Sequence, residues 1–268
     1  MAQTDLRDDK PARERRQRVQ SVETGMAVLK GLAGLGGRAG LSVLAAHVGE
    51  NPAKVHRYLT SLTQEGLVAQ DPVTQQYLLG PECIHIGLAA MRQSDPLRAA
   101  EPALARLRME HQVTCFLAVM GNKGPTIVRF EEPALPVTIN VRAGSVLSLL
   151  FSATGRAFLG LLDDPGLLAA AEAELQAAPP AARASLPPGN AVAGLREQVR
   201  RDGVGWVRDT YLPGISAVAA PVRDHGGRVC AVITALGATG GFDPSPDGPL
   251  ADAVRAEAEQ VSRALGCR

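Results

Sequence analysis

The residues best placed to do chemistry lie on one face of a helix predicted between Asn51 and Gly66. Val55, Leu59 and Leu62 recur at helical spacing and, at about 100° per residue, form an inward stripe. The rest of the helix carries small, hydroxyl, imidazole and cationic side chains, namely Ala53, Lys54, His56, Arg57, Thr60 and Ser61. Such groups can bind base edges and phosphates in the major groove of DNA, with alanine against a thymine methyl group. An ordinary surface helix could carry the same face, so this pattern alone leaves both interpretations open.

A shorter helix is predicted just before it, because apolar residues recur at helical spacing over 41–48. Gly49 follows where a helix stop is expected, Asn51 is a good N-cap, and Pro52 fits the first helical position. Two short helices joined by a glycine-containing turn form a helix-turn-helix pattern. Ser42 of the shorter helix and Asn51 of the turn are therefore added to the predicted DNA contacts.

The segments on either side extend this pattern. Residues 68–80 predict two short strands around an Asp71-Pro72 turn, which would form a wing. Before the pair of helices, Ser21 is the expected N-cap of a first amphipathic helix. Its predicted apolar face consists of Val22, Met26, Val28, Leu29 and Leu32. Three helices and a wing over residues 20–80 predict a winged helix-turn-helix domain.

At this point the sequence resembles the IclR family of bacterial transcriptional regulators. The resemblance is carried by Ser21-Val22-Glu23, Val55-His56-Arg57-Tyr58-Leu59, Gly66-Leu67-Val68 and Tyr77-Leu78-Leu79-Gly80, and it continues to the C-terminus. It implies operator DNA as a partner, a homodimer or dimer of dimers, and a C-terminal effector-binding domain. The family commonly has Pro-Lys-Ser-Thr where this chain has Asn51-Pro52-Ala53-Lys54. Two hydroxyl groups are therefore missing at the helix start, which affects the operator sequence that would be bound.

Length and charge frame this interpretation. The chain has 268 residues, which is enough for two domains, and 46% hydrophobic residues, which excludes a disordered chain. The unit over 20–80 has four Lys or Arg residues and four Asp or Glu residues, and this neutrality leaves a protein–protein interaction module as the alternative function. Residues 1–19 form a basic arm that could enter a minor groove or stay a solvated tail; the arginines expected to support DNA binding are Arg13, Arg15, Arg16 and Arg18.

Several other functions are disfavoured by the sequence. No G-x-S-x-G, P-loop or His-Glu-x-x-His motif occurs, so we expect no enzymatic activity and no cofactor. The four cysteines are far apart, so we expect reduced thiols and no metal site; they are Cys83, Cys115, Cys230 and Cys267. The sequence shows no signal peptide and no apolar run long enough to span a membrane, which predicts a cytoplasmic protein.

The second half predicts a linker helix over 81–95 and an effector-binding domain over 96–268. The linker implies dimer contacts by the family resemblance, although the helix after it could simply pack on its own sheet. Strands are expected at 113–120, 126–130, 137–141, 206–207, 215–221 and 228–236, and helices at 96–111, 152–162, 163–176, 191–202 and 243–265, with a loop at 177–190. Hairpin-linked strands with helices to one side predict an α+β domain on a mainly antiparallel sheet. It resembles the GAF/PAS-like effector domain of the IclR family.

Three segments resemble the walls of the family's effector pocket, at 147–159, 205–221 and 231–237. Free N–H groups at a helix start beside Ser152 and Thr154 suit an anion, although the same residues could only complete a turn. The predicted effector-binding residues are Leu147, Ser152, Ala153, Thr154, Val207, Asp209, Ala217, Thr234 and Leu236. Their aliphatic character favours an aromatic or branched metabolite, carboxylates included, over the smallest acids. Binding would shift the linker and so change the spacing of two recognition helices.

Overall fold

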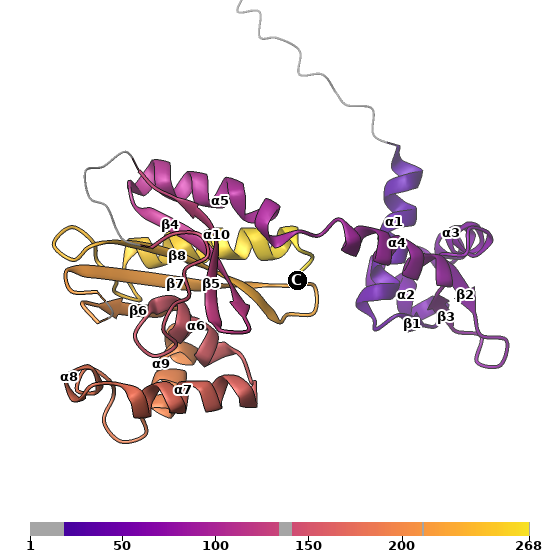
Figure 1. The fold of residues 1–268 in the computed structure, drawn as a ribbon. Coiled ribbons are helices and arrows are strands. Elements are labelled where there is room, and N and C mark those ends of the chain that lie inside the picture. The colour runs from indigo at the N-terminus through magenta and orange to yellow at the C-terminus, as the bar shows by residue number, and fades with distance from the viewer. Residues whose placement is uncertain (1–18, 134–140, 211, 268) are drawn as a thin grey trace, which may run out of the picture. The chain divides into compact units, whose positions relative to one another are not determined.

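The computed structural model describes residues 19–133, 141–210 and 212–267 (Figure 1). It divides into two compact units between Gln93 and Ser94. The predicted basic arm lies outside the described residues apart from Val19. None of the helices within the described ranges is long and apolar enough to cross a membrane.

The N-terminal unit is a winged helix, as predicted. Its elements are α1 (Gln20–Gly34), β1 (Arg38–Ala39), α2 (Leu41–Val48), α3 (Pro52–Gln64), β2 (Val68–Gln70), β3 (Tyr77–Leu79) and α4 (Pro81–Arg92). The inward stripe of α3 packs with α1 and α2 in one core, where Val55, Leu59 and Leu32 are fully buried. Burial of these side chains is the main force that holds the three helices together.

Three details of this unit differ from the prediction. Helix α1 begins at Gln20 with Val19 as its N-cap, so Ser21 lies inside the helix and caps nothing. Val22 and Met26 are 60% and 41% exposed because the core-facing side of α1 is centred on Val28, Gly31 and Leu32. Strand β1 was not predicted; it pairs with β3 and completes an antiparallel sheet of order β1-β3-β2.

The C-terminal unit contains a five-stranded antiparallel sheet of order β5-β4-β8-β7-β6. Its strands are β4 (Thr114–Gly121), β5 (Gly124–Glu131), β6 (Gly205–Arg208), β7 (Ile215–Arg223) and β8 (Val229–Ala238). Its helices are α5 (Pro96–His111), α6 (Ala153–Leu161), α7 (Pro165–Ala177), α8 (Pro180–Arg183), α9 (Ala191–Asp202) and α10 (Pro249–Ala264). The α+β prediction is thus confirmed.

Helices cover both faces of this sheet, whereas the sequence pattern predicted them on one face. Figure 1 shows α5 and α10 along one face and α6 on the other, with α7 and α9 beyond α6. Two cores result: one contains Leu104, Val218 and Val254, and the other contains Phe116, Phe158 and Val232. Helix α6 is buried along nearly its whole length because α9 packs on the side that the sheet leaves uncovered.

The boundaries of other elements need correction. Helix α10 begins at Pro249 rather than at Asp243, since Pro244, Pro246 and Gly248 keep the preceding chain out of a helix. The predicted loop over 177–190 contains the short helix α8. The strand predicted at 137–141 falls outside the described residues except for Val141.

Candidate functional site

Two candidate sites can be built from the predicted residues, one in each unit. The first is the exposed side of α3. Its start is fixed by Asn51, whose Oδ1 accepts a hydrogen bond from the Ala53 N–H at 2.8 Å, with Pro52 in the first helical turn. Ala53, Arg57 and Thr60 are exposed, as are the other predicted contacts Ser42, Asn51, His56 and Ser61. The face is therefore available to a partner, as the sequence suggested.

Two members of this face have partners inside the unit. The Lys54 ammonium donates to Glu50 Oε1 at 2.8 Å and is half-buried. The Nδ1 atom of His56 lies 3.1 Å from the hydroxyl of Tyr77 in the wing strand β3, so the ring is held by a neighbouring element. The guanidinium group of Arg57 forms no hydrogen bond or ion pair with the part of the chain that the structure describes, and the Arg57 carbonyl oxygen accepts a hydrogen bond from the Ser61 hydroxyl. Arg57 is thus the cation on α3 that is free to pair with a phosphate or a guanine.

The second candidate site is a cavity between α6 and the sheet in the C-terminal unit. Its volume is about 40 Å³, close to the volume that one water molecule occupies in liquid water. It is lined by Phe116, Val141, Leu147, Ser152, Ala153, Thr154, Val207, Leu212, Ile215, Ala217, Thr234 and Leu236. Eight of the nine predicted effector-binding residues therefore surround one cavity, although they come from four separate segments.

The polar groups of this cavity gather at the start of α6. Ser152 Oγ accepts from the Gly155 N–H at 2.9 Å and donates to the Ser148 carbonyl oxygen at 2.6 Å. Thr154 Oγ1 and Thr234 Oγ1 are 2.8 Å apart and buried. The first N–H groups of an α-helix have no acceptor within the helix and attract negative charge. Those of Ala153 and Thr154 belong to residues that line the cavity, so this end of the cavity suits an oxyanion.

Asp209 is the exception among the predicted effector-binding residues, because it is not part of the cavity wall. Its backbone is left-handed, with φ of 52°. Its Oδ1 accepts hydrogen bonds from the Gly214 N–H and the Thr239 hydroxyl, each at 2.8 Å. Asp209 therefore holds the loop between β6 and β7 in place.

The cavity also includes four residues that the sequence analysis missed, namely Phe116, Val141, Leu212 and Ile215. Phe116 lies in the wall because of the register between β4 and β8, which pairs it with Thr234, and a pattern within one strand does not determine that register. Val141, Leu212 and Ile215 lie in or beside loops, where no periodic pattern exists.

Helix α6 packs closely on the loop before it, and this packing requires a residue without a side chain at Gly155. Any Cβ on Gly155 would collide with the carbonyl oxygen of Ser148 and would lie 2.6 Å from the Leu149 Cα. The next residue, Arg156, is buried and donates to the carbonyl oxygens of Leu150 at 2.8 Å and Trp206 at 2.9 Å. Burial lowers the pKa of the Arg156 guanidinium to about 10. Arg156 thus ties α6 both to the preceding loop and to β6, which contributes Val207 to the cavity.

Comparison with known proteins gives matches to both units. A family model described as the C-terminal domain of the bacterial transcriptional regulator IclR matches residues 88–263. A second model, described as the IclR helix-turn-helix domain, matches residues 21–72. Together the two models extend over most of the chain.

Individual relatives agree with these models. The crystal structure of Pseudomonas aeruginosa HmgR is 40% identical in sequence, with a TM-score of 0.82 over 93% of this chain and 99% of that chain. The transcriptional regulator BhcR of Paracoccus denitrificans is 26% identical over 85% of this chain and 81% of its own length. The transcriptional repressor AllR of Klebsiella pneumoniae is 25% identical over 93% of this chain and 91% of its own length. BhcR is named as a transcriptional regulator and AllR as a transcriptional repressor.

Proposed function

This chain belongs to the IclR family of bacterial transcriptional regulators, and from that premise we propose that an aromatic or branched metabolite controls its binding to operator DNA. The class of metabolites includes carboxylates. The metabolite would bind in the cavity beside α6, and α3 would contact the operator. The single observation that supports the ligand class is the composition of the cavity: aliphatic and aromatic walls with one polar end at a helix N-terminus. Such a protein acts in the cytoplasm, where its DNA lies.

A solved relative makes this ligand class chemically reasonable. The structure of an IclR homologue from Microbacterium hydrocarbonoxydans is described as complexed with 4-hydroxybenzoate; it is 19% identical, with a TM-score of 0.50 over 91% of this chain and 98% of that chain. In the present chain, an aromatic carboxylate could place its carboxylate at the N–H groups of Ala153 and Thr154 and its ring against Phe116, Val207 and Leu236. The hydroxyl groups of Thr154 and Thr234 would supply further hydrogen bonds.

The small size of the cavity suggests how binding could act as a switch. At about 40 Å³ it cannot hold an aromatic ring without movement of its walls. A ligand would therefore stabilise an expanded arrangement over the closed one, and its differential affinity for the two sets the size of the shift. Leu212, in the loop between β6 and β7, is suited to such movement, because loops adjust at lower cost than packed strands. Ile215 follows it at the first position of β7.

Ligand preference is the first test of this proposal. Isothermal titration calorimetry with the full-length protein should show tighter binding of 4-hydroxybenzoate, benzoate or a branched 2-oxo acid than of pyruvate. The expected margin is at least about tenfold, because each additional buried apolar group contributes roughly 1 kcal/mol or more. A Thr154→Val variant should weaken the binding of the carboxylates but leave the fold intact. Tight binding of the smallest 2-oxo acids alone would rule out the proposed ligand class.

We also propose that α4 forms a contact between two copies of the chain. The structure buries none of its side chains, and Ile84, Leu88 and Met91 are 62%, 45% and 47% exposed on one side of the helix. An exposed apolar stripe of this kind is typical of an interface. A homodimer would place two α3 helices against a pseudo-palindromic operator. Dimerisation would also double the phosphate contacts, which matters because residues 20–80 carry no net charge.

The oligomeric state tests this second proposal. Light scattering after size exclusion should show a dimer or larger assembly for the unaltered protein and a smaller species for an Ile84→Glu, Leu88→Glu double variant. Charged groups in an apolar interface cost several kcal/mol of association free energy. Ala89→Glu is the matched control, because Ala89 is exposed on the other side of α4. If the double variant and the control both keep the full assembly, α4 is not the interface.

A further inference from the structure

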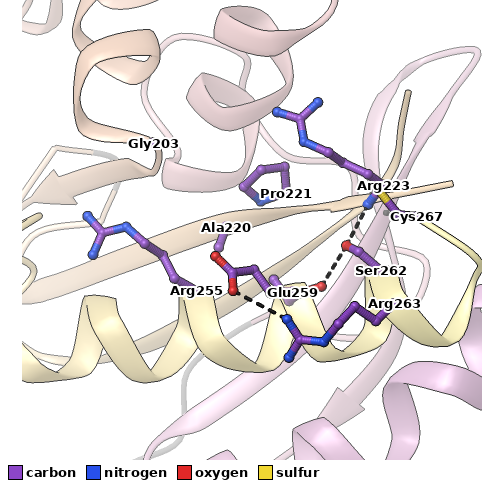
Figure 2. Close-up of a pocket in the computed structure, with 10 residues that line it drawn as sticks. Gly203, Ala220, Pro221, Arg223, Arg255, Glu259, Ser262, Arg263 and Cys267 are labelled. Atoms are coloured by element: carbon purple, nitrogen blue, oxygen red, sulfur yellow. Dashed lines mark hydrogen bonds and ion pairs between the residues drawn. The ribbon is translucent and has the colours of Figure 1, made fainter. Parts of the chain in front are cut away.

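A second and larger cavity lies on the other face of the sheet in the C-terminal unit. Its volume is about 460 Å³, and it opens between α10 and the part of β7 that extends beyond β6 (Figure 2). Strand β6 pairs with β7 only over Ser216–Ala219, so residues 220–223 of β7 form a free edge. This cavity shares no lining residue with the cavity beside α6. It is large enough for a small metabolite without any movement of its walls.

The charged groups of this cavity are mostly positive. Arg223, Arg255 and Arg263 line it together with a single acidic residue, Glu259. Figure 2 shows the side chains of Arg223 and Arg255 around Pro221, and Arg263 turned toward Glu259. Three guanidinium groups against one carboxylate leave a formal excess of two positive charges in the lining.

The arginines differ in how far the protein already neutralises them. Arg263 is 3.6 Å from Glu259, and Arg255 donates to Asp252 Oδ1 at 2.7 Å. Arg223 instead donates to the Gly227 carbonyl oxygen at 3.0 Å, and no ion pair to it occurs among the described residues. A guanidinium that has only a carbonyl partner retains both its charge and most of its N–H donors. Arg223 is therefore the strongest available anchor for an anion.

The floor between these charges is apolar. Ala220 and Ala258 are about 1% exposed and bring small side chains to the bottom of the cavity. The backbone beneath is fixed, because the Arg223 N–H donates to Ser262 Oγ at 2.9 Å and joins β7 to α10. A rigid apolar floor with cationic groups around its rim suits a ligand with a small carbon body and charged ends.

We propose that this cavity is a second ligand site, specific for a small dianionic metabolite: a phosphate monoester or a dicarboxylate. Guanidinium groups bind both kinds of oxyanion through paired N–H donors. Arg223 contacts one carboxylate of a dicarboxylate, or the phosphate of a monoester. Arg255 and Arg263 attract the second carboxylate, or the second negative charge of the phosphate. Glu259 opposes the ligand, so its charge limits the affinity of the site. The lining residues alone carry an excess of two positive charges, and Asp252, which lies outside the lining, offsets part of the charge of Arg255.

The test is calorimetry on the full-length protein in a low-chloride buffer, with glycerol 3-phosphate, succinate and inorganic phosphate as probes. The proposal expects binding of glycerol 3-phosphate or succinate with Kd below about 1 mM. The two probes distinguish the phosphate from the dicarboxylate source. Preference for inorganic phosphate over both organic dianions, or no binding of either organic dianion at that level, would overturn the proposal.

Three variants assign the site. Arg223→Gln should weaken binding at least about tenfold, since it removes a charge-assisted contact. Glu259→Gln should tighten binding several-fold, and this opposite change distinguishes a real site from a damaged fold. Arg228→Gln is the matched control, because Arg228 carries the same charge but pairs with Asp224 and does not line the cavity. Equal losses in Arg223→Gln and Arg228→Gln, or weaker binding in Glu259→Gln, would refute the assignment.

Discussion

Replacement of Arg57 by alanine is expected to abolish tight operator binding while the protein stays folded. Loss of one base or phosphate contact costs about 1–3 kcal/mol, and a dimer loses two such contacts, so the affinity should fall roughly a hundredfold or more. The Arg57 side chain is exposed and has no partner among the described residues, so its removal leaves the core of the N-terminal unit unchanged. Fluorescence anisotropy with operator DNA measures the loss, and circular dichroism checks the fold.

A matched control separates a local contact from general electrostatics. Arg228→Ala removes the same charge from an exposed hairpin of the C-terminal unit and should leave DNA affinity unchanged within about twofold at physiological salt. If Arg57→Ala binds the operator as tightly as the unaltered protein, α3 does not use Arg57 to contact DNA. If it unfolds, the role assigned to Arg57 as a contact residue is wrong.

Replacement of Gly155 by alanine is expected to destabilise the C-terminal unit and impair ligand binding. The added methyl group would collide with the Ser148 carbonyl oxygen and with Leu149, both of which belong to the backbone and cannot rotate away. Overpacking of this kind costs about 1–3 kcal/mol, which is several degrees in the unfolding midpoint. The loop and α6 would have to separate, and that movement displaces Ser152 and the N–H groups at the polar end of the cavity.

Calorimetric unfolding with and without 4-hydroxybenzoate measures both effects. Gly240→Ala is the control, because its Cβ would have no neighbour within 4 Å and its backbone is not left-handed. An unchanged midpoint for Gly155→Ala would contradict the close packing of α6 on the preceding loop.

The sequence predicted an element most accurately where its structure depends on residues close by in the chain. Asn51 and Pro52 fix the start of α3 by local capping, and the spacing of Val55 and Leu59 identifies its buried side. The same reasoning failed at Ser21. As an N-cap, Ser21 would place the first helical residue at Val22, but α1 begins two residues earlier, at Gln20. Strand β1 left no pattern, since two residues are too few for alternation and the strand exists only by pairing with β3.

The residues of the cavity beside α6 were also predicted only in part. The family segments located Ser152, Thr154, Thr234 and Leu236, which line one space although they are distant in sequence. Phe116 and Ile215 depend on the register between strands, which single-strand patterns do not determine. Asp209 was predicted to bind the effector because its segment resembles a pocket wall of the family; in the structure its carboxylate accepts a hydrogen bond from the Gly214 N–H and does not line the cavity. The cavity lined by Arg223 and Arg255 could not be predicted, because it depends on where β6 ends and α10 crosses β7.

The most direct test of the account is an anisotropy titration of the full-length protein with two labelled duplexes. One comes from upstream of the protein's own gene and the other is its scrambled sequence; both are titrated over a series of salt concentrations, with and without the aromatic carboxylate that binds best by calorimetry. An effector-controlled operator-binding protein should bind the first duplex with a Kd of about 1–100 nM and the second at least about a thousandfold more weakly. The affinity should depend steeply on salt and should change when the carboxylate is added. Equal affinity for both duplexes, or an affinity for the first duplex that the bound carboxylate leaves unchanged, would contradict this prediction.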